Sequence, residues 1–465
     1  MTTTATATRP RPEAPTAAPI AAALERALDQ TVRIPDTTLV RLAVPAPAAA
    51  PATLLAAGDH AAVWEPRDDD QAWAGVGAAA VITATGADRF AAIAAAGRAA
   101  LAGLITIGEA PAPRWLGGFA FACGGADAAP WQGFGDASFT LPRWSYVRDG
   151  DAARLVLTAR AGELGDRAAL HAELARVLAL LATPCPAPRA TVVGQTDLAA
   201  PRWIAEIERI RAAIASGALR KVVAARARTL TLGRAVDAAA VVAELGRRQP
   251  ACTRFGFARG AATFVGASPE RLIRKRGRAL DSEALAGSIA RTGDDRAAAA
   301  ELQASAKDGG EHAWVVEAIQ AALAPRCRAL TVPPAPTVRT LRQILHLHTP
   351  LVGELARDHH VLELVAALHP TPAVGGTPTP AAVAWIARHE PSPRGWYAAP
   401  VGWFDDAGDG EFAVAIRSGL VAGPTATLYA GAGIVADSDP VAELAETELK
   451  LRALSGAMLD EAEPR

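Results

Sequence analysis

Cysteine is scarce in this chain of 465 residues, which contains only Cys123, Cys185, Cys252 and Cys327. The four are far apart and form no C-x-x-C pair, which argues against a zinc knuckle or a disulfide framework. Reduced thiols are typical of the cytoplasm, so we expect a cytoplasmic protein.

Long hydrophobic runs are also absent. No stretch of about 18 uncharged apolar residues occurs, and the Thr-, Ala- and Pro-rich segment 1–19 lacks the apolar region of a signal peptide. The sequence therefore indicates neither a membrane-spanning nor a secreted protein. Because segment 1–19 is so poor in large apolar residues, we predict that it is a disordered tail.

The chain has no excess of charge of either sign. Its 47 basic and 48 acidic side chains give a net charge of −1, so no overall field attracts nucleic acid or an anionic membrane. Hydrophobic residues make up 51% of the chain, which is enough for a large core. A small molecule is therefore the expected partner.

The chain divides into two halves at a proline-rich connection, residues 183–201. Segment 20–200 mixes strand patterns with alanine-rich helical patterns, and few of its polar groups converge. Segment 201–465 opens with an amphipathic helical pattern and contains nearly all of the clustered polar residues. We expect the second half to carry the chemistry.

Segment 429–450 combines a glycine-interrupted strand with a charged helix. Gly431 and Gly433 lack a Cβ, so a ligand or another backbone could approach closely there. In the helix, the approximately 100° rotation per residue places Glu443, Glu446 and Lys450 on one face. Two carboxylates brought together away from water need a cation, and oxygen ligands suit Mg²⁺. This face is predicted to be half of a magnesium site.

A second helical pattern, residues 307–323, repeats the acidic spacing with Asp308 and Glu311. Acids in a first helical turn also interact favourably with the helix dipole, so this pair alone has an ordinary explanation. Two such pairs facing each other would form an oxygen-rich metal cradle.

Two further residues have both an ordinary and a catalytic interpretation. Lys221 stands at the entrance of a predicted strand, where a lysine usually only protects an exposed edge. Glu270 follows a turn at Ser268 and Pro269, and carboxylates next to turns are usually solvated. From the pattern alone, the ordinary interpretation is favoured for Lys221.

Three more candidates remain open on the residues alone. Segment 284–288, which ends in Gly287 and Ser288, contains small residues that permit either a ligand contact or close packing. His346 lies on a predicted strand, where a lone histidine is more often structural. Arg417 ends an apolar strand, and its anionic partner could be a substrate carboxylate or an internal acid.

Nine short segments occur in one order that resembles the chorismate-utilising enzymes, and among them the isochorismate synthases. The match is dense over 201–458 and loose before it. The segments are K-V-V-A-A-R, S-P-E-R-L, A-L-A-G-S, K-D-G-G-E-H, L-H-L-H-T-P, H-P-T-P-A-V-G-G, R-G-W-Y-A-A-P-V-G-W, F-A-V-A-I-R-S and G-A-G-I-V…S-D-P-V-A-E-L-A-E-T.

The resemblance implies a single α+β domain of two stacked, largely antiparallel sheets flanked by helices. Chorismate and Mg²⁺ would bind in a cleft built by the second half. Glu311 and Glu446 match magnesium ligands, and Asp308 and Glu443 beside them would act through water.

The resemblance also implies a substrate site. Arg417 and Tyr397 match residues that hold the pyruvyl carboxylate, and Lys450 matches a lysine near the acids. The other positions matched to substrate contacts are Gly287, Ser288, His346, Ala373, Gly431 and Gly433.

The implied reaction is an allylic displacement. Lys221 would take a proton from water that attacks one ring carbon, while Glu270 would protonate the departing ring hydroxyl. This requires a lowered pKa for the lysine and a raised pKa for the glutamate, which desolvation could supply to both.

Rival activities within the family differ at single positions. Anthranilate synthases have glutamine where Lys221 stands and use ammonia from a partner. Aminodeoxychorismate synthases have lysine at position 286. We therefore expect no glutamine amidotransferase subunit, and we expect the chain to be a monomer. Salicylate synthases share the lysine and are the alternative, although they have threonine where Ala373 stands. A magnesium-dependent binding protein without turnover would leave Lys221 and Glu270 unexplained. The pathway, towards menaquinone or a siderophore, stays open.

Overall fold

The computed structural model describes residues 17–68, 71–291 and 293–459. Most of the predicted tail lies outside the described residues. Its last three residues are helical, because the first helix, α1 (Ala17–Leu28), begins at Ala17 and buries Ile20 and Leu24. The prediction of disorder up to residue 19 is therefore wrong for these three positions.

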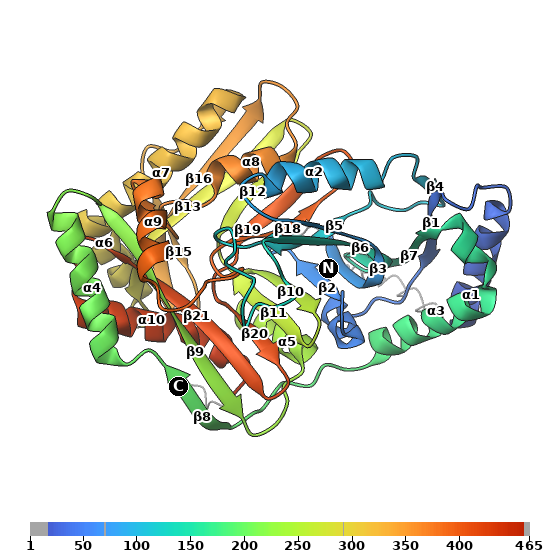
Figure 1. The fold of residues 1–465 in the computed structure, drawn as a ribbon, viewed down its shortest axis with the longest axis horizontal. Coiled ribbons are helices and arrows are strands. Elements are labelled where there is room, and N and C mark those ends of the chain that lie inside the picture. Colours follow the sequence, from blue (N-terminus) through green and yellow to red (C-terminus); the bar gives the residue numbers. More distant parts are fainter. Residues whose placement is uncertain (1–16, 69–70, 292, 460–465) are drawn as a thin grey trace, which may run out of the picture.

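The first half of the chain contains three α-helices in the described residues, and most of it lies at one end of the molecule. The opposite end is formed by α4 (Ala200–Ala215), α7 (Ala306–Leu323), α9 (Thr379–His389) and α10 (Pro440–Ser455) (Figure 1). Its elements are α1, β1 (Leu39–Pro45), β2 (Ala62–Glu65), β3 (Ala72–Ala84), α2 (Arg89–Ala100), β4 (Ile105–Ile107), β5 (Trp115–Phe119), β6 (Ala137–Asp149), β7 (Ala152–Arg160), α3 (Arg167–Ala182) and β8 (Val192–Asp197). Short 3₁₀ turns cover Asp29–Thr31, Pro51–Ala57 and Ala161–Gly165.

The second half follows without a break. Its first elements are α4 (Ala200–Ala215), β9 (Lys221–Leu232), α5 (Ala238–Arg248), β10 (Thr253–Arg259), β11 (Ala262–Ser268), β12 (Arg271–Arg276), β13 (Ala279–Ala290), α6 (Asp295–Ala304) and α7 (Ala306–Leu323). After a 3₁₀ turn at Ala324–Arg326 come β14 (Cys327–Thr331), β15 (Thr337–Thr340), β16 (Ile344–Leu355), α8 (Val361–Leu368), β17 (Gly376–Thr377), α9 (Thr379–His389), β18 (Pro400–Phe404), β19 (Gly410–Val414), β20 (Ser418–Ala422), β21 (Thr425–Ile434) and α10 (Pro440–Ser455).

Backbone pairing links the 21 strands of the described residues into one network with two arms that share β6. One arm runs from β6 through β3, β2, β10, β11, β20 and β21 to β9. The other runs from β6 through β5, β18, β19, β12 and β13 to β16. All of these pairs are antiparallel, so the predicted α+β class with two largely antiparallel sheets is confirmed, the sheets being joined at β6.

Two large hydrophobic clusters each contain buried residues of both halves. Trp131 of the first half packs edge-on against Phe264 of the second, with ring centroids 5.0 Å apart, and Phe139 contacts Phe404 in the same way at 5.3 Å. Strand pairs β5–β18 and β2–β10 also join the halves. Burial of large aromatic rings is a dominant stabilising contribution, so the first half completes the domain that carries the site.

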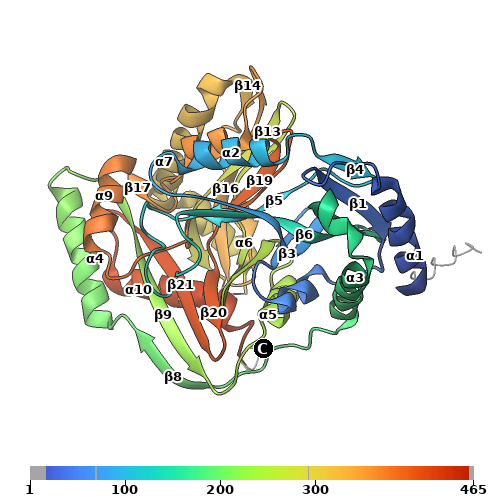
Figure 2. The same ribbon diagram turned by 45° about the vertical axis from the view of Figure 1, so that its right-hand side comes forward.

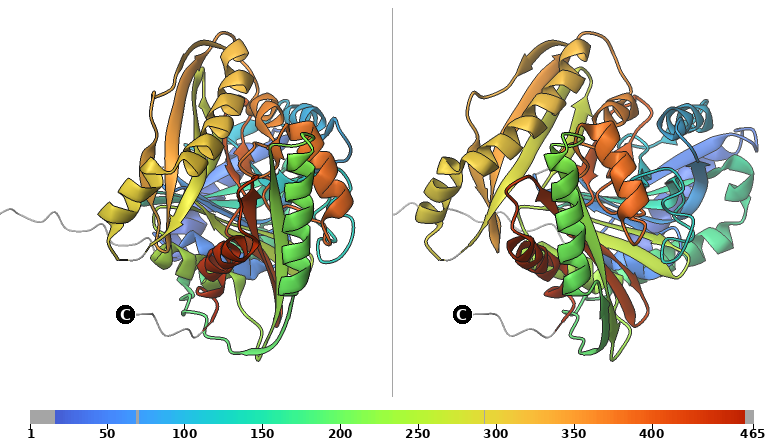
Figure 3. Two further views of the ribbon diagram at one scale, coloured as in Figure 1. Left: turned by 90° about the vertical axis from the view of Figure 1, so that its left-hand side faces the viewer. Right: turned by 60° about the vertical axis from the view of Figure 1, so that its left-hand side comes forward.

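Two helices of the second half pack on strands that carry predicted site residues. Helix α7 lies on β13 and α10 lies on β21, on the side of the molecule that Figure 3 brings forward and at the left in Figure 2. The sequence sets the start of α10, because Asp439 accepts hydrogen bonds from the Val441 and Ala442 amides and Pro440 occupies the first turn. None of the described helices is long and apolar enough to cross a membrane.

Candidate active site

A cavity of about 270 Å³ opens where the two arms of the sheet meet α7 and α10. Its size is near the lower end of that of pockets that hold small organic ligands. Every predicted site residue except Lys221 lines it. These are Glu270, Gly287, Ser288, Asp308, Glu311, His346, Ala373, Tyr397, Arg417, Gly431, Gly433, Glu443, Glu446 and Lys450.

Lys221 lies directly beneath this lining. It is the first residue of β9 and is 1% exposed, and β9 is paired with β17 on one side and β21 on the other. Its Nζ lies 2.5 Å from Glu311 Oε1. The interpretation of Lys221 as protection for a solvent-exposed strand edge is therefore wrong.

The glycines of β21 make room for this pair. A Cβ on Gly433 would lie 2.5 Å from Glu311 Oε1 and 2.8 Å from Lys221 Cε, closer than real Cβ atoms approach. Gly431 accepts a hydrogen bond of 2.9 Å from Lys450 Nζ through its carbonyl oxygen. The glycine spacing thus allows charged side chains, as well as any ligand, to lie against the backbone of β21.

The four predicted metal-binding acids come from the two helices, and each has a partner. Lys307 on α7 reaches Glu443 on α10, with 3.2 Å between Nζ and Oε1. Glu446 pairs with Lys450 and accepts a bond of 3.0 Å from Ser288 Oγ. The Asp308 carboxylate accepts the Ser288 amide at 3.2 Å. Glu311 is held by Lys221, as described above.

Burial and mutual repulsion act on the acidic pair of α10. Burial, reinforced by the neighbouring Glu446, raises the pKa of Glu443. Burial opposes ionisation of Glu446 too, but the ammonium of Lys450 outweighs it and lowers the pKa of Glu446. In the part of the chain that the structure describes, no three His, Cys, Asp or Glu side chains form a group that could hold a metal. The oxygen donors suit Mg²⁺ by type, whereas in this arrangement lysines neutralise three of the four acids.

Glu270 lies between β11 and β12 and is 3% exposed. Its backbone is fixed, since its carbonyl oxygen accepts the Val414 amide at 3.1 Å and its amide donates to Ser268 Oγ at 3.2 Å. Burial, reinforced by the charge of Glu283, raises the pKa of Glu270 to about 8. The expectation of a solvated carboxylate next to a turn is wrong, and Glu270 can carry a proton at neutral pH.

Arg417 and His346 face the cavity as a pair. His346 Nδ1 lies 3.2 Å from the Gly287 carbonyl oxygen, and its Nε2 lies 3.2 Å from Arg417 Nη2. A carbonyl only accepts and a guanidinium only donates, so His346 carries its proton on Nδ1 and orients Arg417 through Nε2. Burial lowers the pKa of His346 to about 3, in agreement with a neutral ring.

The internal acid considered as a partner for Arg417 is not observed. Across residues 17–68, 71–291 and 293–459, no carboxylate forms an ion pair with this arginine. Arg417 also has a φ of 53°, a left-handed conformation that is strained for a non-glycine residue. Tyr397, whose ring stacks on Tyr429 at 5.2 Å, lines the same part of the cavity. A small anionic ligand is thus the remaining candidate partner.

Four charged residues near the cavity were missed by the sequence analysis: Arg67, Glu283, Lys307 and Arg339. Glu283 gave a detectable signal, since it directly precedes the largely apolar segment 284–289, and a buried acid needs partners. Nothing in the local pattern marks Arg67 or Arg339, because both reach the cavity region from distant segments.

Comparison with known proteins places this geometry in a family. The model of the family described as "Chorismate binding enzyme" matches residues 23–459. The chain is 41% identical over 355 residues to the salicylate biosynthesis isochorismate synthase of Pseudomonas aeruginosa, a match that covers 75% of this chain and 74% of that protein. It is 36% identical over 355 residues to the isochorismate synthase MenF of Bacillus subtilis, with 75% of each chain covered.

A solved structure agrees over nearly the full length. The menaquinone-specific isochorismate synthase MenF of Escherichia coli superposes with a TM-score of 0.78 and 30% sequence identity, covering 94% of this chain and 99% of that one. The family that the nine sequence segments resemble accords with these matches. This chain belongs to the family of chorismate binding enzymes, the chorismate-utilising family that its motifs resemble.

Proposed function

We propose that this protein is an isochorismate synthase. It adds water to one ring carbon of chorismate and releases the ring hydroxyl of another carbon as water, so that substrate and product are isomers. The observation that carries the proposal is that a buried lysine and a buried, protonatable glutamate lie at one cavity that also presents Arg417. The similarity to named isochorismate synthases supports it.

In the proposed reaction, Lys221 is the general base and Glu270 the general acid. Lys221 accepts a proton from the attacking water, and Glu270 donates its proton to the departing hydroxyl. The raised pKa of Glu270, about 8, keeps the acid protonated at neutral pH. A positioned acid or base is worth roughly 10²- to 10⁴-fold in rate.

The substrate carboxylates need cationic partners. Arg417, oriented by His346 and accompanied by Tyr397, is proposed to bind the pyruvyl carboxylate by charge-assisted hydrogen bonds. Gly287, Ser288, Gly431, Gly433 and Lys450 would contact the rest of the molecule, since they line the same cavity.

Mg²⁺ is the proposed cofactor. Glu311 and Glu446 would hold the ion, with Asp308 and Glu443 beside them, because carboxylate oxygens are the ligands that Mg²⁺ prefers. When bound, it would supply positive charge for the ring carboxylate of chorismate. Three of these acids are neutralised by lysines, namely Lys221, Lys307 and Lys450. When the ion binds, these lysines would have to share the carboxylates with it or release them.

The reaction uses water, so no ammonia-delivering amidotransferase subunit is proposed. The described chain supplies every residue assigned above, which supports activity as a monomer. All four cysteines are free thiols, in keeping with the proposed cytoplasmic location.

Product analysis tests the proposal. Purified protein incubated with chorismate and Mg²⁺ should form isochorismate, identified by chromatography against authentic standards. The same equilibrium mixture should be reached whether the reaction starts from chorismate or from isochorismate. Tight chorismate binding without any isomer formation would identify a binding protein and would contradict the proposed activity.

A further inference from the structure

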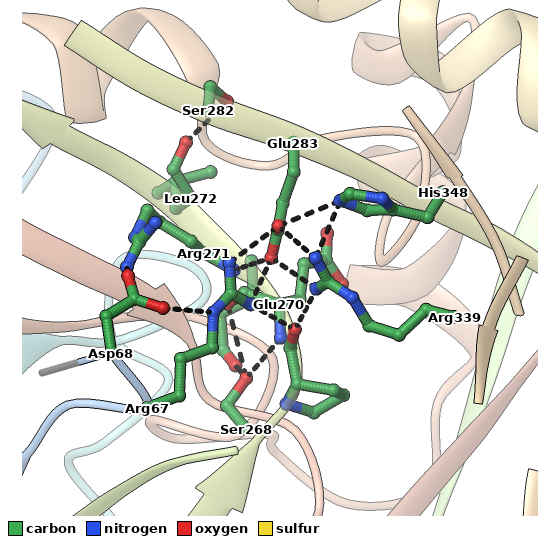
Figure 4. Close-up of polar contacts among 12 residues, drawn as sticks. Arg67, Asp68, Ser268, Glu270, Arg271, Leu272, Ser282, Glu283, Arg339 and His348 are labelled. Atoms are coloured by element: carbon green, nitrogen blue, oxygen red, sulfur yellow. Dashed lines mark hydrogen bonds and ion pairs between the residues drawn. The ribbon is translucent and has the colours of Figure 1, made fainter. Parts of the chain in front are cut away.

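Glu283, on β13, is a buried carboxylate held by two arginines. Arg67 donates to its two oxygens at 2.6 and 2.7 Å, and Arg339 donates to the same two oxygens at 3.0 Å each. His348 Nε2 lies 3.1 Å from Oε2. Figure 4 shows the two arginine side chains approaching Glu283 from opposite sides, next to the backbone of Glu270. Such bidentate pairs fix geometry as well as charge.

The same three side chains hold the backbone on both sides of Glu270. The Pro269 carbonyl oxygen accepts from Arg67 Nη1 at 2.7 Å and from Arg339 Nη1 at 2.9 Å. The Arg271 amide donates to Glu283 Oε1 at 2.7 Å. The peptide groups before and after Glu270 are thereby tied to one buried ion cluster, which limits the positions its carboxyl group can take.

The cluster joins three distant parts of the chain. Arg67 follows β2 in the first half, Glu283 lies in β13 and Arg339 lies in β15. Without the first half, Glu283 would keep Arg339 and lose its shorter pair of bonds. The first half thus contributes directly to the surroundings of the acid, in addition to completing the core.

We propose that Glu283, acting through Arg67 and Arg339, is the positioning residue for the catalytic acid Glu270, an inference that rests on the function proposed above. A stable fold alone does not call for this arrangement, because replacing a buried ion cluster by apolar groups of similar volume is often neutral or stabilising.

The cluster also acts on Glu270 through charge. The charged groups that act most on the pKa of Glu270 are Glu283 on β13, Lys221 on β9, Arg339 on β15 and Arg417 after β19, and Arg67 lies against the adjacent Pro269 carbonyl. Glu283 raises the pKa of Glu270, in the same direction as burial, whereas the three cations lower it. Burial opposes ionisation of Glu283 itself, but the adjacent His348 and the bonds from Arg67 hold its pKa well below the usual range. Its charge is therefore present throughout the working pH range.

Two substitutions should move the pH profile in opposite directions. Glu283→Gln removes a negative charge, so the pKa of Glu270 falls and the alkaline limb of kcat should move about one pH unit or more to lower pH. The rate at pH 8 should drop at least about fivefold and recover partly near pH 6. Arg339→Gln removes a positive charge, so the pKa of Glu270 rises and the alkaline limb of kcat should move to higher pH.

Matched variants separate positioning from general damage. Glu244→Gln on α5 also removes a buried carboxylate that binds two arginines, Arg247 and Arg248, and its pH profile should match that of the unchanged protein. Glu283→Asp keeps the negative charge, so the alkaline limb of its kcat profile should lie close to that of the unchanged protein. Its maximal kcat should be lower, because the shorter side chain changes the geometry. Lower plateaus with unmoved limbs in both Glu283→Gln and Arg339→Gln would overturn the inference.

A measurement without turnover keeps the two proposals distinguishable. Thermal unfolding as a function of pH includes the ionisation of Glu270. The loss of stability with rising pH starts near pH 4.5 in both proteins and should level off at lower pH in Glu283→Gln than in the unchanged protein. If the unchanged protein failed to convert chorismate, the proposed function would fail, while identical stability profiles would separately overturn the role of Glu283.

Discussion

Lys221 Nζ lies 2.5 Å from Glu311 Oε1, so the proposed base and a proposed metal ligand form one buried ion pair. A lysine that accepts a proton has to act as a free amine, and this contact has to be given up first. Binding of the substrate and binding of a cation at Glu311 are therefore expected to be coupled to the freeing of Lys221.

Lys221→Gln should reduce kcat by roughly 10²- to 10⁴-fold, the usual contribution of a positioned base. Glutamine keeps a polar group next to Glu311 but cannot accept the proton from water. Chorismate binding, measured by calorimetry, and the circular dichroism spectrum should stay close to those of the unchanged protein. A rate within about threefold of the original would return Lys221 to a structural role.

Glu270→Gln should slow turnover by roughly 10²- to 10⁴-fold and stabilise the protein at alkaline pH. The folded-state pKa of Glu270, about 8, lies above the ordinary value of 4.5, so its favourable contribution is complete below pH about 4.5 and is lost as pH rises towards 8. Glutamine does not ionise, so the variant should avoid a loss on the order of a few kcal/mol.

The measurement for Glu270→Gln is chemical unfolding at several pH values between 5 and 9. The difference in unfolding free energy between variant and unchanged protein should grow with pH. A difference that stays constant across this range would show that Glu270 is not protonated in the folded protein.

Glu446→Gln should weaken Mg²⁺ binding by at least about tenfold, because a ligand charge is lost while the shape is kept. Glu448→Gln provides the control on the same helix, since Glu448 pairs with Arg226 and Arg228 away from the cavity. Titration calorimetry with Mg²⁺ in the presence of chorismate distinguishes the two. Equal affinities in both variants, together with turnover that survives EDTA, would contradict the metal assignment.

Gly433→Ala should lower activity at least about tenfold with a small effect on folding. The added methyl group would lie 2.5 Å from Glu311 Oε1 and 2.8 Å from Lys221 Cε, so the pair must move. Gly194→Ala on β8 is the control, because its new Cβ would meet Thr231 at an ordinary contact distance of 3.5 Å. Comparable kcat in the two variants would mean that the position of the Lys221–Glu311 pair does not matter.

The released product should be isochorismate with its pyruvyl group retained. Ala373 lines the cavity where salicylate synthases have threonine, and a smaller residue should hold the intermediate less tightly. About 1.4 kcal/mol between release and elimination changes the product ratio tenfold. Coupled assays for pyruvate and salicylate fluorescence give the ratio. Stoichiometric pyruvate from the unchanged protein, formed faster than isochorismate decays by itself, would favour the salicylate synthase alternative.

The sequence by itself determined the family, the α+β class and most of the polar residues that line the cavity. The features that can be read from the sequence are local. They are the capping residues Asp439 and Pro440, the apolar strand pattern at 427–435 and the repeated acidic spacing. Such features depend on short motifs or on the fixed periods of helices and strands. The resemblance then supplied residues such as Ala373 that no periodicity would have marked.

Only the tertiary structure decided the environment of each charge. Lys221 and Glu270 occupy positions that are usually solvated, yet they are only 1% and 3% exposed. Arg67 and Arg339 reach the backbone beside Glu270 from segments about 200 and 70 residues away in the chain. Burial and pKa depend on what packs around a group in space, and that packing is set by long-range contacts that no local pattern contains.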